Sequence, residues 1–463
     1  MFAREVFALF VAVCAGPYCG PDSKYESPAG SSPESIAAPA VAVAADGTCY
    51  LVWEAHAAGS SHAWFGRRGP GPGGSWAEPF ALDEGGTAAI EVRVAAGADR
   101  RVAVVWQARD PRDGELRFRA SPDGGATWSP EARLPAAGGD ARRSMAQIAS
   151  APDGTWYAAW EEIAGGERGV RFARSLDGGS GFHPSLRLDA GEPGGASYHP
   201  QISALDSGTV LVAWWEERDG RTELLFRRST DAGESWGAEG RFAGSSGTDV
   251  VARRDARLAA RDRTTAIAWE ETDSVGSVRV FAARSTDAGE TWSEPWTCGT
   301  GVYAAVAVGV EDWAVAWTVR NPAPPGRTSI AGRIVDLPET RTFRVALPAR
   351  GVESPLFELS PPAHLALASA RGGLWVVGSG QAAGRTVVEA HGFRDGRWNR
   401  GAVLSFGGNG PRDYVPWEAR SLVAAATEDG GVHVAWISDS GGRGELAYVR
   451  LETATAAGTA ARP

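Results

Sequence analysis

Short apolar segments recur along this chain of 463 residues, and most of them end in a tryptophan that is followed by an acidic residue. From about Ala37 the unit that contains such a segment repeats at a period of roughly fifty residues. Each unit predicts a small apolar first strand, a second strand with the Trp-Glu pair, an alternating third strand and a short fourth strand. The aligned tryptophans are Trp53, Trp106, Trp160, Trp215, Trp269 and Trp317.

Two less regular units follow, around residues 374–378 and 432–436. The repeats therefore predict an all-β protein, a β-propeller with eight four-stranded antiparallel blades. Seven blades are the alternative because the last units are irregular. Six blades would leave a long stretch of the chain outside the propeller. The last unit stops after its third strand, and an open sheet edge is a liability. A segment within residues 25–36 is expected to supply the missing strand and close the ring.

A second motif lies between the third and fourth strands of four units, with the pattern Ser-x-Asp-x-Gly-x-x-aromatic. Its serine and aspartate are expected to bind the backbone of a tight turn, in which glycine supplies a positive φ. The closing aromatic residue is expected to pack back onto the sheet. The four copies contain Ser121, Asp123, Gly125 and Trp128; Ser175, Asp177, Gly179 and Phe182; Ser229, Asp231, Gly233 and Trp236; and Ser285, Asp287, Gly289 and Trp292.

This motif resembles the Asp-box, or BNR repeat, of the sialidase superfamily and related β-propellers. The resemblance covers the repeats over most of the chain and implies the propeller fold. In that family the boxes lie in blade hairpins, away from the active site. The family's catalytic signature, Phe/Tyr-Arg-Ile/Leu-Pro, is absent from the first unit, where SIAAPAVAV stands instead and no arginine lies at that position.

In such a propeller, the loops that follow second strands and those that enter each new blade share one face, over the central channel. A sialidase-type reaction, as the resemblance implies, needs arginines for the sugar carboxylate. It also needs a Tyr–Glu nucleophile and an aspartate as acid/base. The catalytic candidates of these types on that face are Arg143, Arg254, Arg420, Tyr303, Tyr414, Glu217, Glu271 and Asp255. Ligand contacts are expected from Tyr198, His199, Arg142 and Arg253.

Composition excludes several other functions. The formal net charge of −10 argues against nucleic acid as a partner. Of the 46 basic residues only Lys24 is lysine, so no Schiff-base or Walker-type lysine is expected in the folded part. The four cysteines show no metal-ligand spacing, and we expect neither a metal nor a cofactor.

The N-terminus predicts export. Residues 1–15 form an apolar run that is too short to span a bilayer, typical of a signal peptide cleaved after Ala15 or of a lipoprotein signal at Cys14. Residues 16–36 are rich in Pro, Ser and Gly and are typical of a linker. The propeller is expected over 37–455, with a tail at 456–463. These features predict an extracytoplasmic monomer, secreted, periplasmic or lipid-anchored at a bacterial cell surface, without a membrane-spanning segment.

Repetition without a unique catalytic constellation favours a non-catalytic or diverged propeller that binds a glycan or an extracellular protein over its channel. One alternative is a glycoside hydrolase of the exo-α-sialidase type, with an arginine clamp and a Tyr/Glu nucleophile. Another is a structural propeller in an envelope complex. Three arginines that converge on one point over the channel, beside a tyrosine or a carboxylate pair, would favour the hydrolase.

Overall fold

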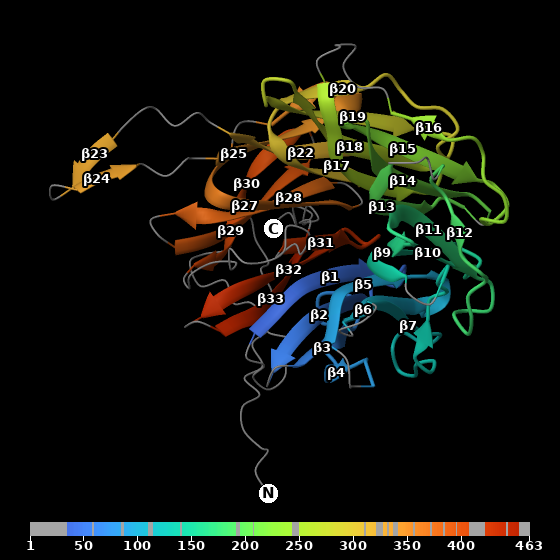
Figure 1. Cartoon of the computed structure of the whole chain (residues 1–463). Coiled ribbons are helices and arrows are strands. Elements are labelled where there is room, and N and C mark those ends of the chain that lie inside the picture. Colours follow the sequence, from blue (N-terminus) through green and yellow to red (C-terminus); the bar gives the residue numbers. More distant parts are fainter. Residues whose placement is uncertain are drawn as a thin grey trace, which may run out of the picture.

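The computed structural model of the chain is all-β, which confirms that part of the predicted fold class (Figure 1). Apart from two short 3-10 helices, η1 (Ala98–Arg100) and η2 (Pro348–Arg350), its regular elements are strands. It describes residues 35–452 except 58–59, 85–87, 110–113, 139–140, 191–194, 207, 243–249, 310–311, 321–326, 331–332, 337–340, 355–356, 371–372, 383–384, 395, 407–421 and 441–442.

The first four units each contain four antiparallel strands in chain order. The first unit comprises β1 (Ser35–Val43), β2 (Cys49–Ala57), β3 (Ser60–Arg68) and β4 (Phe80–Ala81). The second comprises β5 (Ala88–Ala96), β6 (Val102–Arg109), β7 (Glu115–Ser121) and β8 (Ala132–Arg133). The third comprises β9 (Arg142–Ser150), β10 (Trp156–Ala164), β11 (Glu167–Ser175) and β12 (Leu186–Arg187). The fourth comprises β13 (Ala196–Ala204), β14 (Val210–Arg218), β15 (Arg221–Ser229) and β16 (Gly240–Arg241).

The later units keep this order with local changes. The fifth comprises β17 (Val250–Arg261), β18 (Thr264–Asp273), β19 (Val278–Ser285) and β20 (Trp296–Thr300). The sixth comprises β21 (Val302–Val308), β22 (Trp313–Arg320), β25 (Arg341–Leu347) and β26 (Val352–Glu353), with the hairpin β23 (Arg327–Ile330) and β24 (Arg333–Asp336) inserted after β22. The seventh comprises β27 (Phe357–Ala370), β28 (Gly373–Ala382), β29 (Arg385–Arg394) and β30 (Arg397–Phe406). The last described unit comprises β31 (Leu422–Ala426), β32 (Gly431–Ser440) and β33 (Arg443–Glu452).

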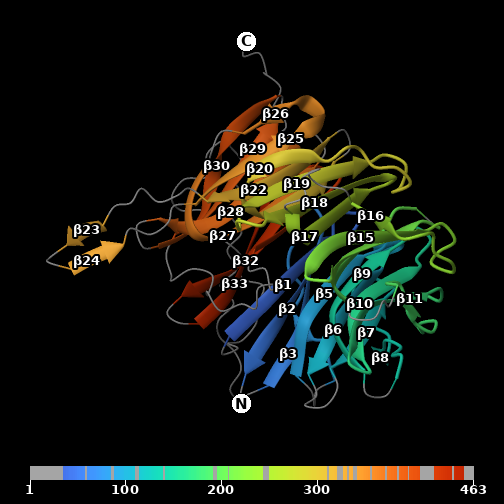
Figure 2. The same ribbon diagram turned by 45° about the horizontal axis from the view of Figure 1, so that its top comes forward.

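The units follow one another in chain order around a common centre, so that the last, in red, lies beside the first, in blue (Figures 1 and 2). β1 contacts β31, β32 and β33. One buried apolar cluster joins Leu51 and Trp53 of the first unit to Ile437 and Tyr448 of the last. The first and last units therefore pack face to face, as neighbouring units do elsewhere in the chain.

The second strand of each regular unit is buried on both faces, because it lies between the sheets of two neighbouring units. In β10 every residue from Trp156 to Glu162 is buried. This burial explains why these strands read as continuous apolar runs rather than as alternating ones. It also explains why each run contains a large tryptophan, which fills the space between two twisted sheets.

The structure corrects the alignment of the fourth unit by one residue. In each unit, positions can be counted from the residue that pairs with the serine of the Ser-x-Asp-x-Gly motif. On this count Trp214 corresponds to Trp160, and both side chains are fully buried. Trp215, the residue aligned from the sequence, occupies the place of Glu161 and is only partly buried. The fourth unit therefore has the core tryptophan but lacks the glutamate that follows it in the third unit.

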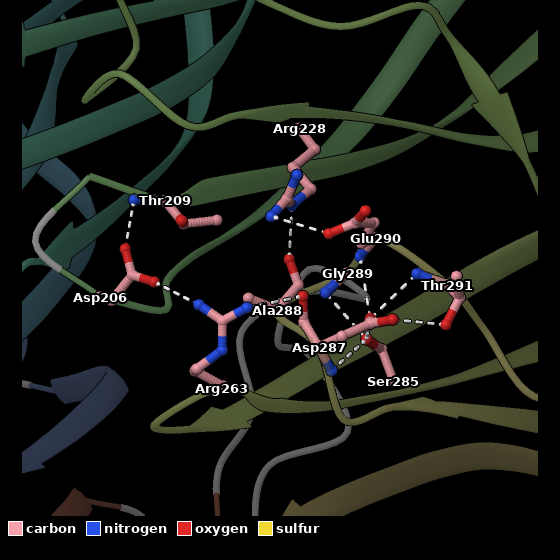
Figure 3. A network of polar contacts seen from close by, with 10 residues as sticks. All are labelled: Asp206, Thr209, Arg228, Arg263, Ser285, Asp287, Ala288, Gly289, Glu290 and Thr291. Carbon is pink, nitrogen blue, oxygen red and sulfur yellow. Dashed lines mark hydrogen bonds and ion pairs between the residues drawn. The ribbon is translucent and has the colours of Figure 1, made fainter.

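The Ser-x-Asp-x-Gly motifs form tight turns after the third strands, and Figure 3 shows the fourth copy. Ser285 Oγ donates to Asp287 Oδ1 (2.7 Å) and accepts from the Gly289 N–H (2.8 Å). Asp287 Oδ1 also accepts from the Thr291 N–H (2.9 Å). Gly289 has φ +80°, a conformation that glycine adopts without steric cost. The side chains of the motif thus replace the backbone pairing that a turn gives up.

Three of these turns are also held by an arginine from the third strand of the preceding unit, as Arg228 in Figure 3 illustrates. The guanidinium donates to a backbone carbonyl inside the turn. The second unit has Ala120 at this position, so the turn after it lacks the contact. The pairs are Arg67 with Gly124 (3.2 Å), Arg174 with Ala232 (3.0 Å) and Arg228 with Ala288 (2.8 Å).

We expect Arg228→Ala to lower the free energy of unfolding by about 1 kcal/mol, because the carbonyl of Ala288 loses a charged donor at a partly exposed site. Urea denaturation followed by tryptophan fluorescence measures this change. Arg221→Ala, an exposed arginine of the same strand, is the matched control and should change stability by less than about 0.5 kcal/mol. Equal effects of the two substitutions would show that the contact with the turn stabilises nothing.

Each turn's aromatic residue packs edge-on against an aromatic residue in the third strand of the preceding unit. The first unit lacks the Ser and Asp of the motif but keeps Trp76, and this side chain packs against Tyr448 of β33. The first unit thus packs against the last unit in the same way as later units pack against the unit before them. The ring-centroid distances are 4.8 Å for Trp128–Phe65, Phe182–Phe118 and Trp236–Phe172, and 4.9 Å for Trp76–Tyr448.

The predicted N-terminal segments lie almost wholly outside the described residues. β1 begins at Ser35, slightly before the expected start of the repeats, and Ser35 and Ile36 pair with His56 and Ala55 of β2. Residues 25–34, the rest of the expected closing segment, are not among the described residues, and neither are the signal segment 1–15 and the tail 456–463. Across the described strands and turns, no helix has the length and apolar character to cross a membrane.

Candidate functional site

A cavity of about 320 Å³ lies at the centre of the units. The first strand of every unit contributes to its wall, so no single loop builds it. Its size is at the lower end of what small-ligand sites occupy. One lining residue from each unit, in chain order, is Ala38, Arg93, Met145, His199, Asp255, Ala305, Ala366 and Leu422.

The first strands of six consecutive units contain a β-bulge whose central residue is left-handed, and none of these residues is glycine. A bulge re-aims the side chains around it. The left-handed conformation costs an L-residue roughly 1–2 kcal/mol, which glycine would avoid. The six residues, with φ between +48° and +57°, are Ala38, Glu91, Met145, His199, Asp255 and Tyr303.

In three units the second-strand glutamate accepts a hydrogen bond from the bulge N–H of the next unit. The bulge breaks the strand pairing, and a buried N–H needs another acceptor. The carboxylate supplies that acceptor and ties one unit to the next, so the Trp-Glu glutamates serve the fold. The pairs are Glu54 with Glu91 (2.5 Å), Glu161 with His199 (2.7 Å) and Glu270 with Tyr303 (2.6 Å).

The second and fourth units depart from this rule. Gln107 replaces the glutamate of the second unit and donates to the Arg143 carbonyl (2.8 Å), while the Met145 N–H donates to Glu91 instead (2.7 Å). In the fourth unit Trp215 stands at this position. The next bulge residue, Asp255, therefore receives no glutamate from the preceding unit.

Trp215 instead forms an aromatic stack at the cavity rim. Its ring lies 4.2 Å from the Tyr198 ring with an interplanar angle of 16°, and 5.3 Å from the His199 ring. The Arg168 guanidinium lies 4.8 Å from the Tyr198 ring centroid. These contacts fix the orientation of His199, which lines the cavity.

The cavity is polar on one side and apolar on the other. Two residues after each bulge, four consecutive units place a long polar side chain in the wall. The first and sixth units place Ala40 and Ala305 at this position, and the last two units contribute further small or branched apolar residues. The four polar residues are Arg93, Gln147, Gln201 and Arg257.

Charges near the cavity shift two neighbouring groups. Burial, with Arg257 and Arg168 close by, lowers the pKa of His199 to about 3, so its imidazole is neutral at pH 7. Burial and the charge of Asp255 raise the pKa of Glu270 to about 7, against the opposing effect of Arg257. The polar wall thus presents a neutral imidazole, a carboxylate and arginines.

Of the site residues expected from the sequence, His199 and Asp255 line the cavity. Tyr303 is 55% exposed at its bulge, and its N–H donates to Glu270. Arg254 is exposed beside Asp255 and pairs in register with Glu270. Arg254, Asp255 and Tyr303 gather around Glu270 where the fifth and sixth units meet, whereas His199 belongs to the fourth unit.

The other candidates lie elsewhere. Arg143 is buried and donates to the Leu134 carbonyl (3.0 Å), and it is not part of the cavity wall. Glu271 is buried and paired with Arg253 (2.9 Å). The remaining candidates are Glu217 and Arg142, which are exposed; Tyr198, which lies in the aromatic stack; and Arg420 and Tyr414, which are outside the described residues.

Sequence reasoning missed the four polar residues of the wall. A signal for them exists in the first strands, where EVRVAA, SMAQIA, YHPQIS and DARLAA share one long polar residue before a branched apolar residue and a small one. The first unit has PAVAVA at this place, and the sixth has AAVAVG. Alignment of the first strands with one another would have found the set.

Solved structures resemble this chain at low sequence identity. No family model matches the sequence, and no curated protein matches it. A PL25 ulvan lyase structure is 10% identical, with 91% of this chain and 93% of that one covered and a TM-score of 0.47. The arabinofuranosidase Arb93A of Fusarium graminearum is 11% identical (79% and 93% covered, TM-score 0.41), and the Hadza microbial sialidase Hz136 is 13% identical (76% and 76%, 0.37). Likenesses this distant assign no activity to this chain.

Proposed function

We propose that the protein binds a glycan in its central cavity and does not cleave it. The observation that carries the proposal is the one-sided polar wall. A sugar presents hydroxyl groups that both donate and accept, and amide, guanidinium and carboxylate groups match both roles. The apolar half of the cavity suits the C–H face of a sugar ring. The polar set comprises Arg93, Gln147, Gln201, Arg257, His199 and Asp255.

The glycan is acidic in this proposal. Two arginines and one carboxylate line the cavity, and the histidine is neutral, so the wall carries a net positive charge. Guanidinium binds a carboxylate or a sulfate group through two parallel hydrogen bonds. Arg93 and Arg257 also donate to backbone carbonyls, at 3.1 Å and 2.9 Å, which restricts their orientation.

Binding is favoured over hydrolysis because the cavity lacks a pair of carboxyl groups. Among the described residues of the wall, Asp255 is the single acid. Glu161 and Glu270 accept hydrogen bonds from backbone N–H groups of the next unit. A glycosidase uses two carboxyl groups, or a tyrosine with a glutamate, on either side of the scissile bond.

One observation favours the hydrolase alternative. Arg254, Asp255, Tyr303 and Glu270 lie together, and the pKa of Glu270 is about 7, a value suited to a general acid. Fluorogenic glycosides, sialosides included, test this alternative, and we expect no turnover. Turnover that Arg254→Ala and Tyr303→Phe both abolish would establish a hydrolase.

The binding test is isothermal titration calorimetry with sialyllactose, tetragalacturonate and a heparin tetrasaccharide, and with lactose as a neutral counterpart. We expect at least one acidic oligosaccharide to bind and lactose not to bind. Arg257→Gln and Arg93→Gln should each weaken that binding at least tenfold, because each loses a charge-assisted hydrogen bond. Arg221→Gln, an exposed residue at the start of β15, is the control. A protein that binds no acidic oligosaccharide contradicts the proposal.

We also propose that the units form a closed eight-bladed propeller. Two observations support this architecture. The cavity takes wall residues from eight first strands. Trp76 of the first unit packs on Tyr448 of the last. The rings meet edge-on, as they do between neighbouring units elsewhere in the chain. A cysteine pair that cross-links β1 to β32 without loss of stability would test the contact.

A further inference from the structure

We infer that the left-handed bulge residues determine which glycan the cavity accepts, with His199 and Asp255 as the main specificity-determining residues. The inference rests on the proposed function, because it concerns the same cavity. Four of the six bulge residues, Ala38, Met145, His199 and Asp255, line the wall.

The first argument comes from strain. The backbone of the bulge repeats from unit to unit, but its side chain does not: it is Ala, Glu, Met, His, Asp and then Tyr. Positions that serve the fold, such as the core tryptophans, keep one residue type. The fold would accept glycine at all six positions without steric cost. Strained residues of varied chemistry around a cavity indicate that the side chains serve a ligand.

The second argument concerns His199, whose bulge backbone is held by a glutamate of the preceding unit. The His199 N–H donates to Glu161, whose carboxylate also binds Arg168 (2.5 Å). The backbone position of His199 therefore depends on Glu161 and not on its own side chain. Units can exchange the side chain at the cavity while they keep the same main-chain geometry.

The chemistry of the two residues is complementary. Among the described residues, the Asp255 side chain has no hydrogen-bond or ion-pair partner, so its oxygens are placed to accept from sugar hydroxyl groups. The His199 ring is held against Trp215, with Nδ1 3.7 Å from Glu161 Oε1, and a neutral imidazole carries one donor and one acceptor nitrogen. Arg257 follows Asp255 in the same wall and takes the acidic group. The preferred ligand is thus an acidic sugar with hydroxyl groups beside its carboxylate or sulfate.

The test compares His199→Gly and Asp255→Gly with Asp262→Gly, which relieves a left-handed residue (φ +53°) in the turn between β17 and β18, outside the cavity wall. Asp255→Gly and Asp262→Gly should have urea midpoints equal to or above that of the wild type, whereas His199→Gly also loses its stack with Trp215 and should have a lower midpoint than these two. Affinity for the acidic oligosaccharide that binds the wild type should fall at least tenfold in His199→Gly and Asp255→Gly. The Asp262→Gly variant should bind as the wild type does.

Different failures identify different errors. If the wild type binds none of the three acidic oligosaccharides, the proposed function is wrong. If the wild type binds and Arg257→Gln weakens binding, but His199→Gly and Asp255→Gly bind normally, only the present inference is wrong. Asp255→Asn keeps the side-chain shape and guards against an unfolded glycine variant. Normal affinity and ligand preference in Asp255→Asn would likewise overturn the inference for Asp255.

Discussion

Truncation of Trp214 to alanine is expected to lower the free energy of unfolding by about 3–5 kcal/mol, while truncation of its neighbour Trp215 costs about 1–2 kcal/mol. Trp214 is fully buried in the apolar cluster between the third and fourth units, where it packs near Tyr157 and Phe172. Its removal leaves a cavity the size of an indole ring. The strands around this cavity are hydrogen-bonded to strands on both sides, so they cannot move far enough to fill it. Trp215 is partly buried at the rim.

Urea denaturation of the two variants measures the difference, with Trp160→Ala as a second core control. Trp215→Ala should also weaken glycan binding, because the ring of His199 loses the surface against which it lies. Trp214→Ala should unfold earlier but, while folded, bind normally. A larger stability loss in Trp215→Ala than in Trp214→Ala would mean that the sequence alignment, and not the structural one, identifies the core residue.

The neighbouring tryptophans show what the sequence predicts well and what it does not. Apolar second strands that end in tryptophan predict repeated four-stranded units because burial on both faces demands such a pattern. The pattern cannot tell which of two adjacent tryptophans is internal. That choice depends on the register of β14 with β15, which runs from Arg218 opposite Arg221 at the hairpin turn to Val210 opposite Ser229 at the far end. Turn geometry sets this register, and a shift of one residue exchanges the two faces.

The site was less predictable for a related reason. The family resemblance supplied residue types, but placement depends on bulges, and no glycine marks these six bulges. Asp255 and His199 reach the cavity because they are bulge residues. Arg143, close to the bulge in its own strand, donates to a carbonyl instead. Arg93 and Arg257 were not predicted as site residues, because their neighbours in the strand are small and apolar. Such neighbours are typical of a strand that packs in the core.

Replacement of Glu270 by glutamine is expected to make the protein more stable than the wild type at neutral pH and above. Burial and the charge of Asp255 raise the pKa of Glu270 from 4.5 to about 7. A carboxyl group whose pKa is higher in the folded state favours folding while protonated. Its contribution is complete below pH 4.5 and is lost as the pH rises to 7, by up to about 3 kcal/mol. Glutamine keeps an acceptor for the Tyr303 N–H and does not titrate.

Unfolding free energies measured from pH 4 to 8 should therefore diverge, with the glutamine variant gaining on the wild type as the pH rises. Asp255→Asn offers the matched control. It removes the repulsive charge and leaves the glutamate, so it should lower the pKa of Glu270 and shrink the divergence. A carboxyl ¹³C titration of Glu270 reports the same shift directly. Arg254 and Arg257 oppose the rise in pKa, so their removal should move it further upward. If the two pH profiles run parallel, the pKa of Glu270 is the same in the folded and unfolded states, and burial does not disfavour the carboxylate that joins the fifth and sixth units.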